Sequence, residues 1–226
     1  MSDHGHHHEH QHSADQASDL EGLWTAEFWD DRYRSSTALW SGHVNAVLAA
    51  EAEDLVPGRA LDVGCGEGGD AFWLAERGWQ VDGIDVSQVA LDRAAAHARE
   101  LGPDLESRIT WTQRDLLSWT PPEATYDLVS VSFVHMHAAD RGAVYAGLAR
   151  AVVPGGSFLV GAHSPLDIGV VPRPPDPDLY FTAEDLAADL GAGWDVVTAE
   201  ARPRPGQHDG ADVTLHDTVL RAVRRA

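Results

Sequence analysis

Short apolar segments alternate with longer amphipathic stretches along this chain, and the alternation predicts strands and helices in turn. The segments expected to form strands are 60–63, 80–85, 109–113, 127–133, 157–161, 195–201 and 217–223. Strands that alternate with helices favour a parallel sheet covered on both faces. A Pro/Gly-rich segment without room for a helix joins the last two strands, which are therefore expected to pair antiparallel.

Polar residues mark where several of the helices should begin. Ser41 precedes a helix expected over 42–55, and Ser87 precedes an alanine-rich helix. Thr182 and Asp185 have the spacing of a capping box at the start of a later helix. Further helices are expected from the glycine cluster near 64–69 to position 78, and over 143–152.

Residues 1–19 show no apolar periodicity and are predicted to be a disordered tail ahead of a folded domain over 20–226. The tail is rich in histidine: His4, His6, His7, His8, His10 and His12. Neutral imidazoles bind divalent transition metals, so the tail is a candidate site for such an ion, with a solvated tail as the alternative. Residues 20–56 form an aromatic lead-in to the domain, expected to be partly helical.

The most specific chemical signal lies where the first strand runs into a glycine cluster and the second strand ends in Asp85. Gly64, Gly66 and Gly69 have the G-x-G-x-x-G spacing, which removes side chains where the backbone turns tightly beside a ligand. The next helix offers free N–H groups to a polar or anionic group. Asp85 lies where a carboxylate takes both hydroxyls of a ribose. The predicted ligand is a nucleoside cofactor.

Two further acids favour S-adenosylmethionine over a nicotinamide dinucleotide. Asp62 precedes the glycines, where a carboxylate can hold a cationic amino group directly or through water, and capping of local backbone is the alternative. Asp115 follows the third strand, where a carboxylate can accept from an adenine amino group while Leu116 packs on the ring; turn formation is the alternative. The chain has no lysine, so the tyrosine–lysine pair of nicotinamide-dependent oxidoreductases is impossible.

The amino-acid composition and net charge indicate which classes of binding partner are favoured. The chain has 16 basic and 36 acidic residues and a net charge of −20, which disfavours nucleic acids and anionic membranes. The single cysteine, Cys65, excludes an internal disulfide framework. No apolar run has signal-peptide or membrane-span character. We therefore expect a cytoplasmic protein that acts on a small molecule, with neither nucleic acid nor membrane as a partner.

The chain resembles the class I S-adenosylmethionine-dependent methyltransferases. Successive segments match the family motifs in order: LDVGCGEG (61–68), GIDVS (83–87), QRDLL (113–117), YDLVSVSFV (126–134) and VPGG (153–156). The resemblance covers about 44–223 and implies an α/β fold, a Rossmann-like doubly wound seven-stranded sheet, mostly parallel with an antiparallel C-terminal strand pair. The lead-in more loosely resembles the branch that includes thiopurine and tellurite-resistance methyltransferases.

The resemblance also implies S-adenosylmethionine as cofactor and in-line transfer of its methyl group to a small-molecule acceptor, which is a thiol, amine, hydroxyl or metalloid. Gly64 and Gly66 then face the methionine part, Asp85 the ribose, and Asp115 with Leu116 the adenine. The remaining implied cofactor contacts are Asp62, Cys65, Val86, Ser132 and Phe133, with Arg32 and Trp40 closing over the site from the lead-in. The alternative for Cys65 is that it only fills a small space in the turn. The alternative for the lead-in is that its aromatic residues belong to the ordinary core packing.

His135 and His137 are the candidate catalytic residues. They follow the strand at 127–133 and lie two positions apart, so in extended chain they point the same way. Three interpretations stay open: a packed or solvated pair, a general base, or a metal site completed by His163. The proline-rich stretch 163–181 is expected to shape the acceptor pocket. Outside enzymes, the rival is a non-catalytic cofactor-binding or metal-handling module of the same fold.

Overall fold

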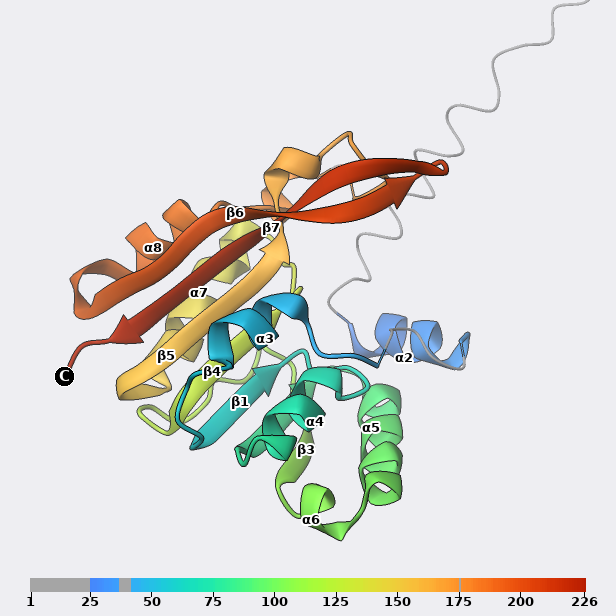
Figure 1. The fold of residues 1–226 in the computed structure, drawn as a ribbon, viewed down its shortest axis with the longest axis vertical. Coiled ribbons are helices and arrows are strands. Elements are labelled where there is room, and N and C mark those ends of the chain that lie inside the picture. The colour runs from blue at the N-terminus through green and yellow to red at the C-terminus, as the bar shows by residue number, and fades with distance from the viewer. Residues whose placement is uncertain (1–24, 37–41, 175) are drawn as a thin grey trace, which may run out of the picture.

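A seven-stranded mixed sheet forms the centre of the computed structural model, which describes residues 25–36, 42–174 and 176–226. The strand order is β3-β2-β1-β4-β5-β7-β6 (Figure 1). The parallel strands are β1 (Arg59–Val63), β2 (Gln80–Asp85), β3 (Ile109–Gln113), β4 (Tyr126–Ser132) and β5 (Val152–His163). β7 (Ala211–Arg224) runs antiparallel to both β5 and β6 (Trp194–His208). The predicted fold class is confirmed.

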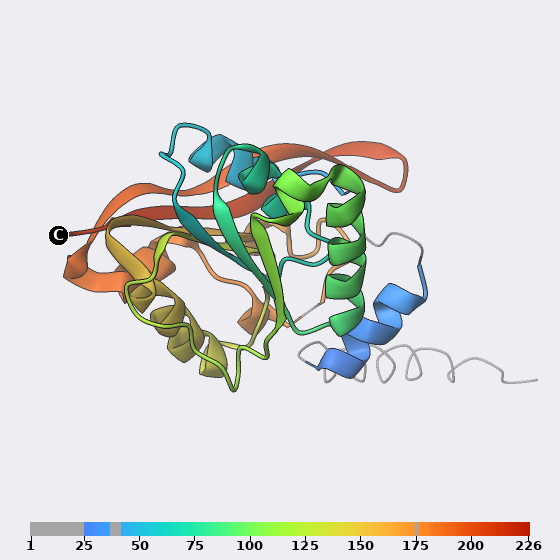
Figure 2. The same ribbon diagram turned by 90° about the horizontal axis from the view of Figure 1, so that it is seen from below.

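Helices cover both faces of this sheet. One face packs against α3 (Ala46–Ala52), α4 (Gly69–Glu76) and α5 (Gln88–Leu101), and the other against α7 (Ala138–Arg150) and α8 (Ala183–Leu190). Helix α2 (Ala26–Arg34) lies against α5, as both views show (Figures 1 and 2). The short elements are α6 (Pro103–Glu106), η1 (Pro165–Asp167), η2 (Pro177–Leu179) and η3 (Gly191–Gly193).

The central strands are apolar at successive positions because each face of the sheet is buried. In β4, Leu128 belongs to the core beneath α3 and α4, and Val129 to the core beneath α7. In β5, Leu159 belongs to the core beneath α3 and α4, and Phe158 to the core beneath α7. Successive side chains of a strand point to opposite faces, so a strand buried on both sides needs a continuous apolar run.

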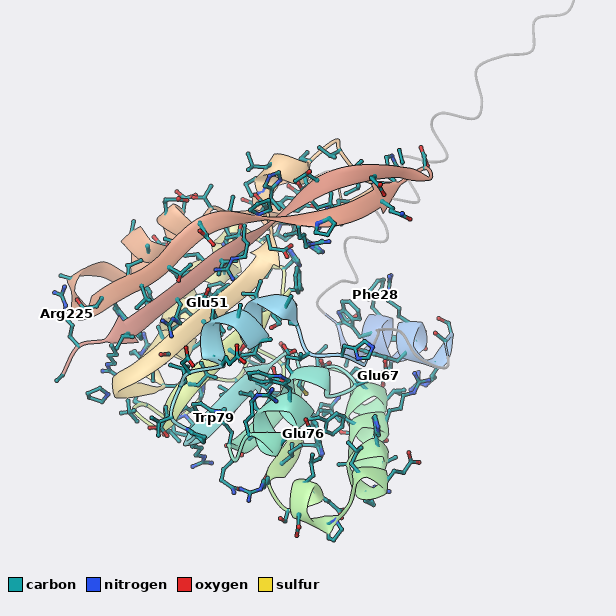
Figure 3. The ribbon with its side chains drawn as sticks, viewed as in Figure 1. Phe28, Glu51, Glu67, Glu76, Trp79 and Arg225 are labelled. Carbon is teal, nitrogen blue, oxygen red and sulfur yellow. The ribbon has the colours of Figure 1, made fainter. Side chains whose placement is uncertain are left out.

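A polar contact fixes α3 to the C-terminal strands. The Glu51 carboxylate pairs with Arg202 of β6 and accepts from the Thr198 hydroxyl at 2.9 Å, and Nη1 of Arg221 on β7 donates to the Glu51 carbonyl at 3.1 Å (Figure 3). The Glu51 side chain is only 9% exposed. Buried charges need such partners, and these hold α3 in place across β5.

Three helix and strand boundaries differ from the sequence prediction. Helix α3 begins at Ala46 behind Asn45, whose side chain accepts from the Val47 N–H at 2.8 Å, whereas Ser41 lies outside the described residues. Helix α7 begins at Ala138 instead of 143, and β5 begins at Val152 instead of 157. The capping box of Thr182 and Asp185 at α8 is confirmed.

The largest departure is at the C-terminus. The expected loop between the last two strands is absent, since the β6–β7 ladder continues to His208 and Ala211. Pro203 lies in β6, an edge strand, where a missing N–H costs no ladder bond on the side that has no partner. The hairpin turns at Asp209 and Gly210, with φ of 50° and 77°, the two positive values of a type I′ turn. Asp-Gly was the sequence signal for this turn.

Gly83 is required by packing, and its substitution tests the register of β2 and β3. A Cβ at Gly83 would lie 2.8 Å from the Trp111 ring. We expect Gly83→Ala to lower the free energy of unfolding by about 1–3 kcal/mol, because the site has no room for a methyl group.

Gly142 provides the matched control. It lies inside α7, and a Cβ there would meet nothing within 4 Å. Gly142→Ala should raise the free energy of unfolding by up to about 1 kcal/mol, since glycine is unfavourable inside a helix. Chemical denaturation measures both variants, and a Gly83→Ala protein as stable as the parent would contradict the packing.

Candidate active site

The candidate site lies at the carboxyl ends of β1, β2, β4 and β5. The chain order of the strands reverses between β1 and β4, and ligands of doubly wound sheets bind at such a switch point. The turn after β1 starts with Gly64 and Cys65, whose N–H groups both donate to the Ile84 carbonyl, at 2.9 and 3.0 Å. Gly64 has a φ of 70°, and a Cβ there would lie 2.5 Å from a methyl group of Val134. Both conformation and space therefore require glycine.

Asp85 stabilises this turn from the end of β2. Its carboxylate accepts from the N–H of Gly66 at 2.9 Å and from the N–H of Ser87 at 2.8 Å. Burial raises the pKa of Asp85, and the backbone N–H donors oppose that shift. One carboxylate thus connects the glycine turn with the start of α5, at the position predicted for ribose recognition.

Asp62 is the least satisfied group of the site. It is 1% exposed, and its Oδ2 has no hydrogen-bond partner in the described structure. Burial raises the pKa of Asp62 well above its usual value, and the nearby charges of Asp70 and Asp85 raise it further. A buried carboxylate with an open oxygen beside two other carboxylates fits a cationic ligand group. The residues present therefore fit the amino group of the predicted cofactor.

Asp70, in the first turn of α4, was missed by the sequence analysis. Its carboxylate accepts from the Asn45 N–H at 2.6 Å and from the Ser132 hydroxyl at 2.8 Å. It therefore joins the start of α3 to the end of β4, where Ser132 lies, and the cofactor contact of Ser132 stays a prediction. The available signal was an acid directly after the glycines, in the first turn of a helix.

The lead-in helix α2 is attached beside the turn by two contacts that the sequence did not reveal. Asp30 accepts from the Ser87 hydroxyl at 2.6 Å and from the Val89 N–H at 3.2 Å. Arg93 of α5 pairs with Glu67 at 2.9 Å and donates to the Tyr33 carbonyl at 2.8 Å. Figure 3 shows Glu67 in the turn before α4, on the side where α2 lies. The described part of the lead-in thus borders the site.

The other predicted cofactor residues differ in their surroundings. Cys65 is buried at 8% exposure, which raises the pKa of its thiol, and the Val86 carbonyl accepts from the Gln113 side chain at 2.9 Å. Asp115 is exposed and accepts from the Leu117 N–H at 2.9 Å, the turn-forming alternative. Leu116 packs against the core beneath α7.

Of the two predicted closing residues, Arg32 lies in the described part of the chain and Trp40 does not. Arg32 is exposed on α2, with its guanidinium 5.8 Å from the centre of the Trp29 ring. Trp40 lies outside the described residues. Their cofactor contacts stay predictions.

The two candidate histidines face different surroundings, contrary to the expected common orientation. Nδ1 of His135 lies 2.9 Å from the Phe133 carbonyl, and its ring stacks on His163 with centroids 5.0 Å apart. His137 is the N-cap residue of α7 and lies 3.3 Å from the Asp178 carboxylate. The chain leaves the extended conformation at Phe133, with a φ of 56°, and residues 134–137 form no strand before α7 begins, so the two-residue alternation of a strand does not apply to the pair.

His135 and His163 are neutral at pH 7. Burial lowers the pKa of His135 to about 4 and that of His163 to about 2. Because Nδ1 of His135 faces a carbonyl oxygen, Nδ1 must carry the proton in the neutral ring. Nε2 of His135 is then a buried lone pair, and the described structure gives it no partner.

Metal-binding groups of side chains and membrane-spanning helices are both absent from the described residues. Among residues 25–36, 42–174 and 176–226, no group of three or more His, Cys, Asp or Glu side chains is arranged to hold a metal, and the histidine tail lies outside these ranges. Within the same part of the chain, no helix combines the length and the apolar character needed to cross a membrane.

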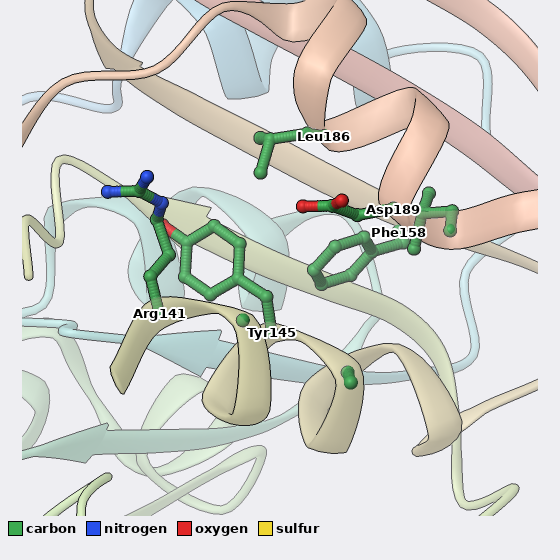
Figure 4. A pocket seen from close by; sticks show the side chains of 8 residues that line it. Arg141, Tyr145, Phe158, Leu186 and Asp189 are labelled. Carbon is green, nitrogen blue, oxygen red and sulfur yellow. The ribbon is translucent and has the colours of Figure 1, made fainter. Parts of the chain in front are cut away.

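A separate cavity of about 270 Å³ lies between α7 and α8 (Figure 4). Its lining includes Tyr145, Phe158 and Leu186, with Arg141 and Asp189 at its border. It is enclosed by the helices that cover one face of the sheet, and it contains none of the predicted cofactor residues. We therefore distinguish it from the candidate site.

Known proteins resemble this chain in sequence and fold. Residues 60–156 match a family model described as a methyltransferase domain. The 27-O-demethylrifamycin SV methyltransferase of Amycolatopsis mediterranei is 29% identical over 69% of the chain and 56% of its own length. The 2-heptyl-1-hydroxyquinolin-4(1H)-one methyltransferase of Mycobacteroides abscessus is 29% identical over 62% of the chain and 66% of its own length. The chain thus spans less than two thirds of these relatives.

One similar solved structure comes from work on the conversion of a disulfide bond into a thioacetal group during echinomycin biosynthesis. It superposes with a TM-score of 0.70 at 25% identity, over 88% of this chain and 91% of its own. The agreement extends well beyond the segment matched by the family model, to most of the described fold.

Substitution of Asp62 tests the electrostatics of the glycine turn in the ligand-free protein. We expect Asp62→Asn to raise the melting temperature at pH 7 by about 2–4 °C, because it removes a buried like charge. A raised pKa means that the folded protein takes up a proton at a higher pH than the unfolded chain. The parent therefore gains stability as the pH falls from 7 toward 4, and its difference from the variant shrinks.

Thermal unfolding at pH 7 and pH 5 measures this difference. Asp54→Asn, at an exposed position, is the control and should not shift the melting temperature. A lower melting temperature for Asp62→Asn than for the parent at pH 7 would disprove the account.

Proposed function

We infer that the chain carries a class I S-adenosylmethionine-dependent methyltransferase domain, and we propose that it transfers the methyl group of S-adenosylmethionine to a small-molecule acceptor. The observation that carries the proposal is the open, buried Oδ2 of Asp62 beside the glycine turn. We assign 20–226 to this domain. The net charge of −20 supports a small molecule over a nucleic acid, and the single cysteine is compatible with the cytoplasm.

The residues of the turn hold the cofactor in this proposal. Asp62 binds the amino group, Gly64 and Gly66 leave room for the methionine part, and Asp85 takes the ribose hydroxyls through the oxygens that already order the turn. The cofactor supplies a sulfonium, an excellent leaving group. The remaining proposed contacts are Cys65 and Val86 near the turn, Asp115 and Leu116 at adenine, Ser132 and Phe133 beside the acceptor, and Arg32 and Trp40 from the lead-in.

The protein's task in such a displacement is to align the nucleophile and exclude water. Asp70 fixes Ser132, and the positive φ of Phe133 turns the chain toward the acceptor side. Nε2 of His135 accepts a hydrogen bond from the nucleophile in this arrangement. With a pKa of about 4 the ring is a weak base, so it orients a thiol, amine or hydroxyl, and the proton that the nucleophile loses as its bond to the methyl carbon forms is released to bulk water.

The first test of the function is calorimetric titration of the full chain with S-adenosylmethionine and, separately, with NADH. Saturable binding of the first alone is expected. Asp85→Asn should weaken that binding by about tenfold or more, because a neutral amide is a poorer partner for two hydroxyls. Asp92→Asn, at a position outside the site, is the matched control.

Release of S-adenosylhomocysteine in the presence of thiols, amines, phenols and metalloid oxyanions then measures turnover. Cofactor binding without turnover on any of these classes would favour the non-catalytic module and count against the enzyme. Binding of NADH in place of S-adenosylmethionine would refute the cofactor itself.

The role of His135 is tested by His135→Phe, which keeps a ring against His163 and removes the lone pair. We expect kcat to fall by about 100-fold with cofactor affinity unchanged, since an aligned hydrogen-bond acceptor is lost. His137→Phe, measured in parallel, separates the two candidate histidines. Unchanged turnover in both variants would exclude both from the reaction.

A further inference from the structure

A second set of polar groups lies at the carboxyl ends of β4 and β5, and three of its side chains have buried polar atoms without a hydrogen-bond partner in the described structure. We call it the loop cluster: His135, His163, Asp167, Arg173 and Tyr180, of which the last three belong to the loop after β5. The Phe133 ring lies 4.6 Å from the His163 ring, so the cluster is continuous with the end of β4. The rings of His135 and His163 stack on each other within the cluster.

Arg173 is buried with most of its hydrogen-bonding capacity unused. Its side chain is 9% exposed, and its Nη2 lies 3.6 Å from the Asp167 carboxylate. Among the residues that the structure describes, the buried Nε and Nη1 have no hydrogen-bond partner. Buried N–H groups of a cation are costly unless an acceptor completes them, so the arrangement favours a ligand that supplies one.

The polar groups near Arg173 in the described structure already have other hydrogen-bond partners. Asp167 accepts from the His216 N–H at 2.9 Å and lies 3.1 Å from its ring nitrogen. Asp217 pairs with Arg204 at 3.0 Å. The Tyr180 hydroxyl donates to the Pro174 carbonyl at 2.8 Å. Burial lowers the pKa of Arg173 despite its neighbouring carboxylates, so the protein leaves this cation under-stabilised.

The loop cluster thus presents two kinds of open group: cationic N–H donors on Arg173 and a lone pair on His135. His163 interacts electrostatically with both His135 and Arg173. Its Nδ1 is also buried and has no hydrogen-bond partner in the described structure. A molecule that matches this set carries an anionic oxygen group for the arginine and a hydrogen-bearing nucleophile for the histidine.

We propose that the loop cluster binds the methyl acceptor and that the acceptor carries a carboxylate, held by Arg173, together with a hydroxyl, amine or thiol directed at His135. This inference rests on the proposed function and specifies its substrate class. A carboxylate matches the site better than a phosphate, because one arginine supplies the free donors and the buried Asp167 and Asp217 oppose a second negative charge.

The test is calorimetric titration of the full chain saturated with S-adenosylhomocysteine. The probes are 3-mercaptopropionate, anthranilate and salicylate, each paired with its neutral carboxamide, and inorganic phosphate. At least one carboxylate should bind saturably and at least about tenfold more tightly than its amide. This comparison uses the parent protein alone and does not depend on the folding of a variant.

Arg173→Lys keeps the charge beside Asp167 and removes the guanidinium donors. It should weaken carboxylate binding by about tenfold and leave affinity for S-adenosylmethionine unchanged. Arg150→Lys, at the exposed end of α7, is the control and should change neither. The proposal is overturned if amides bind as tightly as acids, if phosphate binds and no carboxylate does, or if Arg173→Lys retains full carboxylate affinity.

Failure of the cofactor proposal has a different signature. If the parent binds no S-adenosylmethionine and no S-adenosylhomocysteine, the proposed function fails, and the same probes titrated into the cofactor-free protein still decide the carboxylate site. If the cofactor binds normally and no carboxylate binds, the substrate class alone is wrong.

Discussion

The concentration of buried negative charge at the carboxyl ends of β1 and β2 is the constraint on which the site depends. Asp62, Asp70 and Asp85 are each at most 9% exposed, and the charges of Asp70 and Asp85 add to the cost of ionising Asp62. Each of the three accepts from a backbone N–H group, and the hydrogen bonds of Asp70 and Asp85 fix the start of α3 and the glycine turn. Asp62 keeps an open oxygen. The same electrostatic cost therefore shapes the turn and leaves one position ready for a cation.

The fold could be predicted from the sequence wherever burial requires a pattern. Strands covered on both faces need continuous apolar runs, and β1, which is buried at Ala60 to Val63, was predicted accurately for that reason. The antiparallel pairing of the last two strands was predicted correctly, but their length was underestimated because prolines suggested a loop. An edge strand tolerates proline on its open side, and the Asp209-Gly210 turn signal was present but not used.

The site was predictable in part. Motif spacing identified the glycine turn, Asp62 and Asp85, because local backbone geometry dictates those residue types. Asp70 and Asp30 act through partners distant in the chain, Ser132 and Ser87, so no local pattern signals them. The common orientation predicted for the histidine pair was wrong because β4 ends at Ser132, so the strand alternation on which the prediction depended does not extend to His135 and His137.

The unsatisfied side chains in the glycine turn and in the loop cluster have opposite charges. This distribution of charge suits the methyl transfer proposed for the site. The turn offers surplus carboxylate at Asp62, and the loop cluster offers surplus N–H donors at Arg173. Methyl transfer from a sulfonium to a neutral or anionic nucleophile removes the positive charge from the donor side. Fixed groups of the protein that need no reorganisation stabilise such a shift better than water does. Both surpluses lower the stability of the free protein, as expected where binding sites are preorganised at the expense of folding.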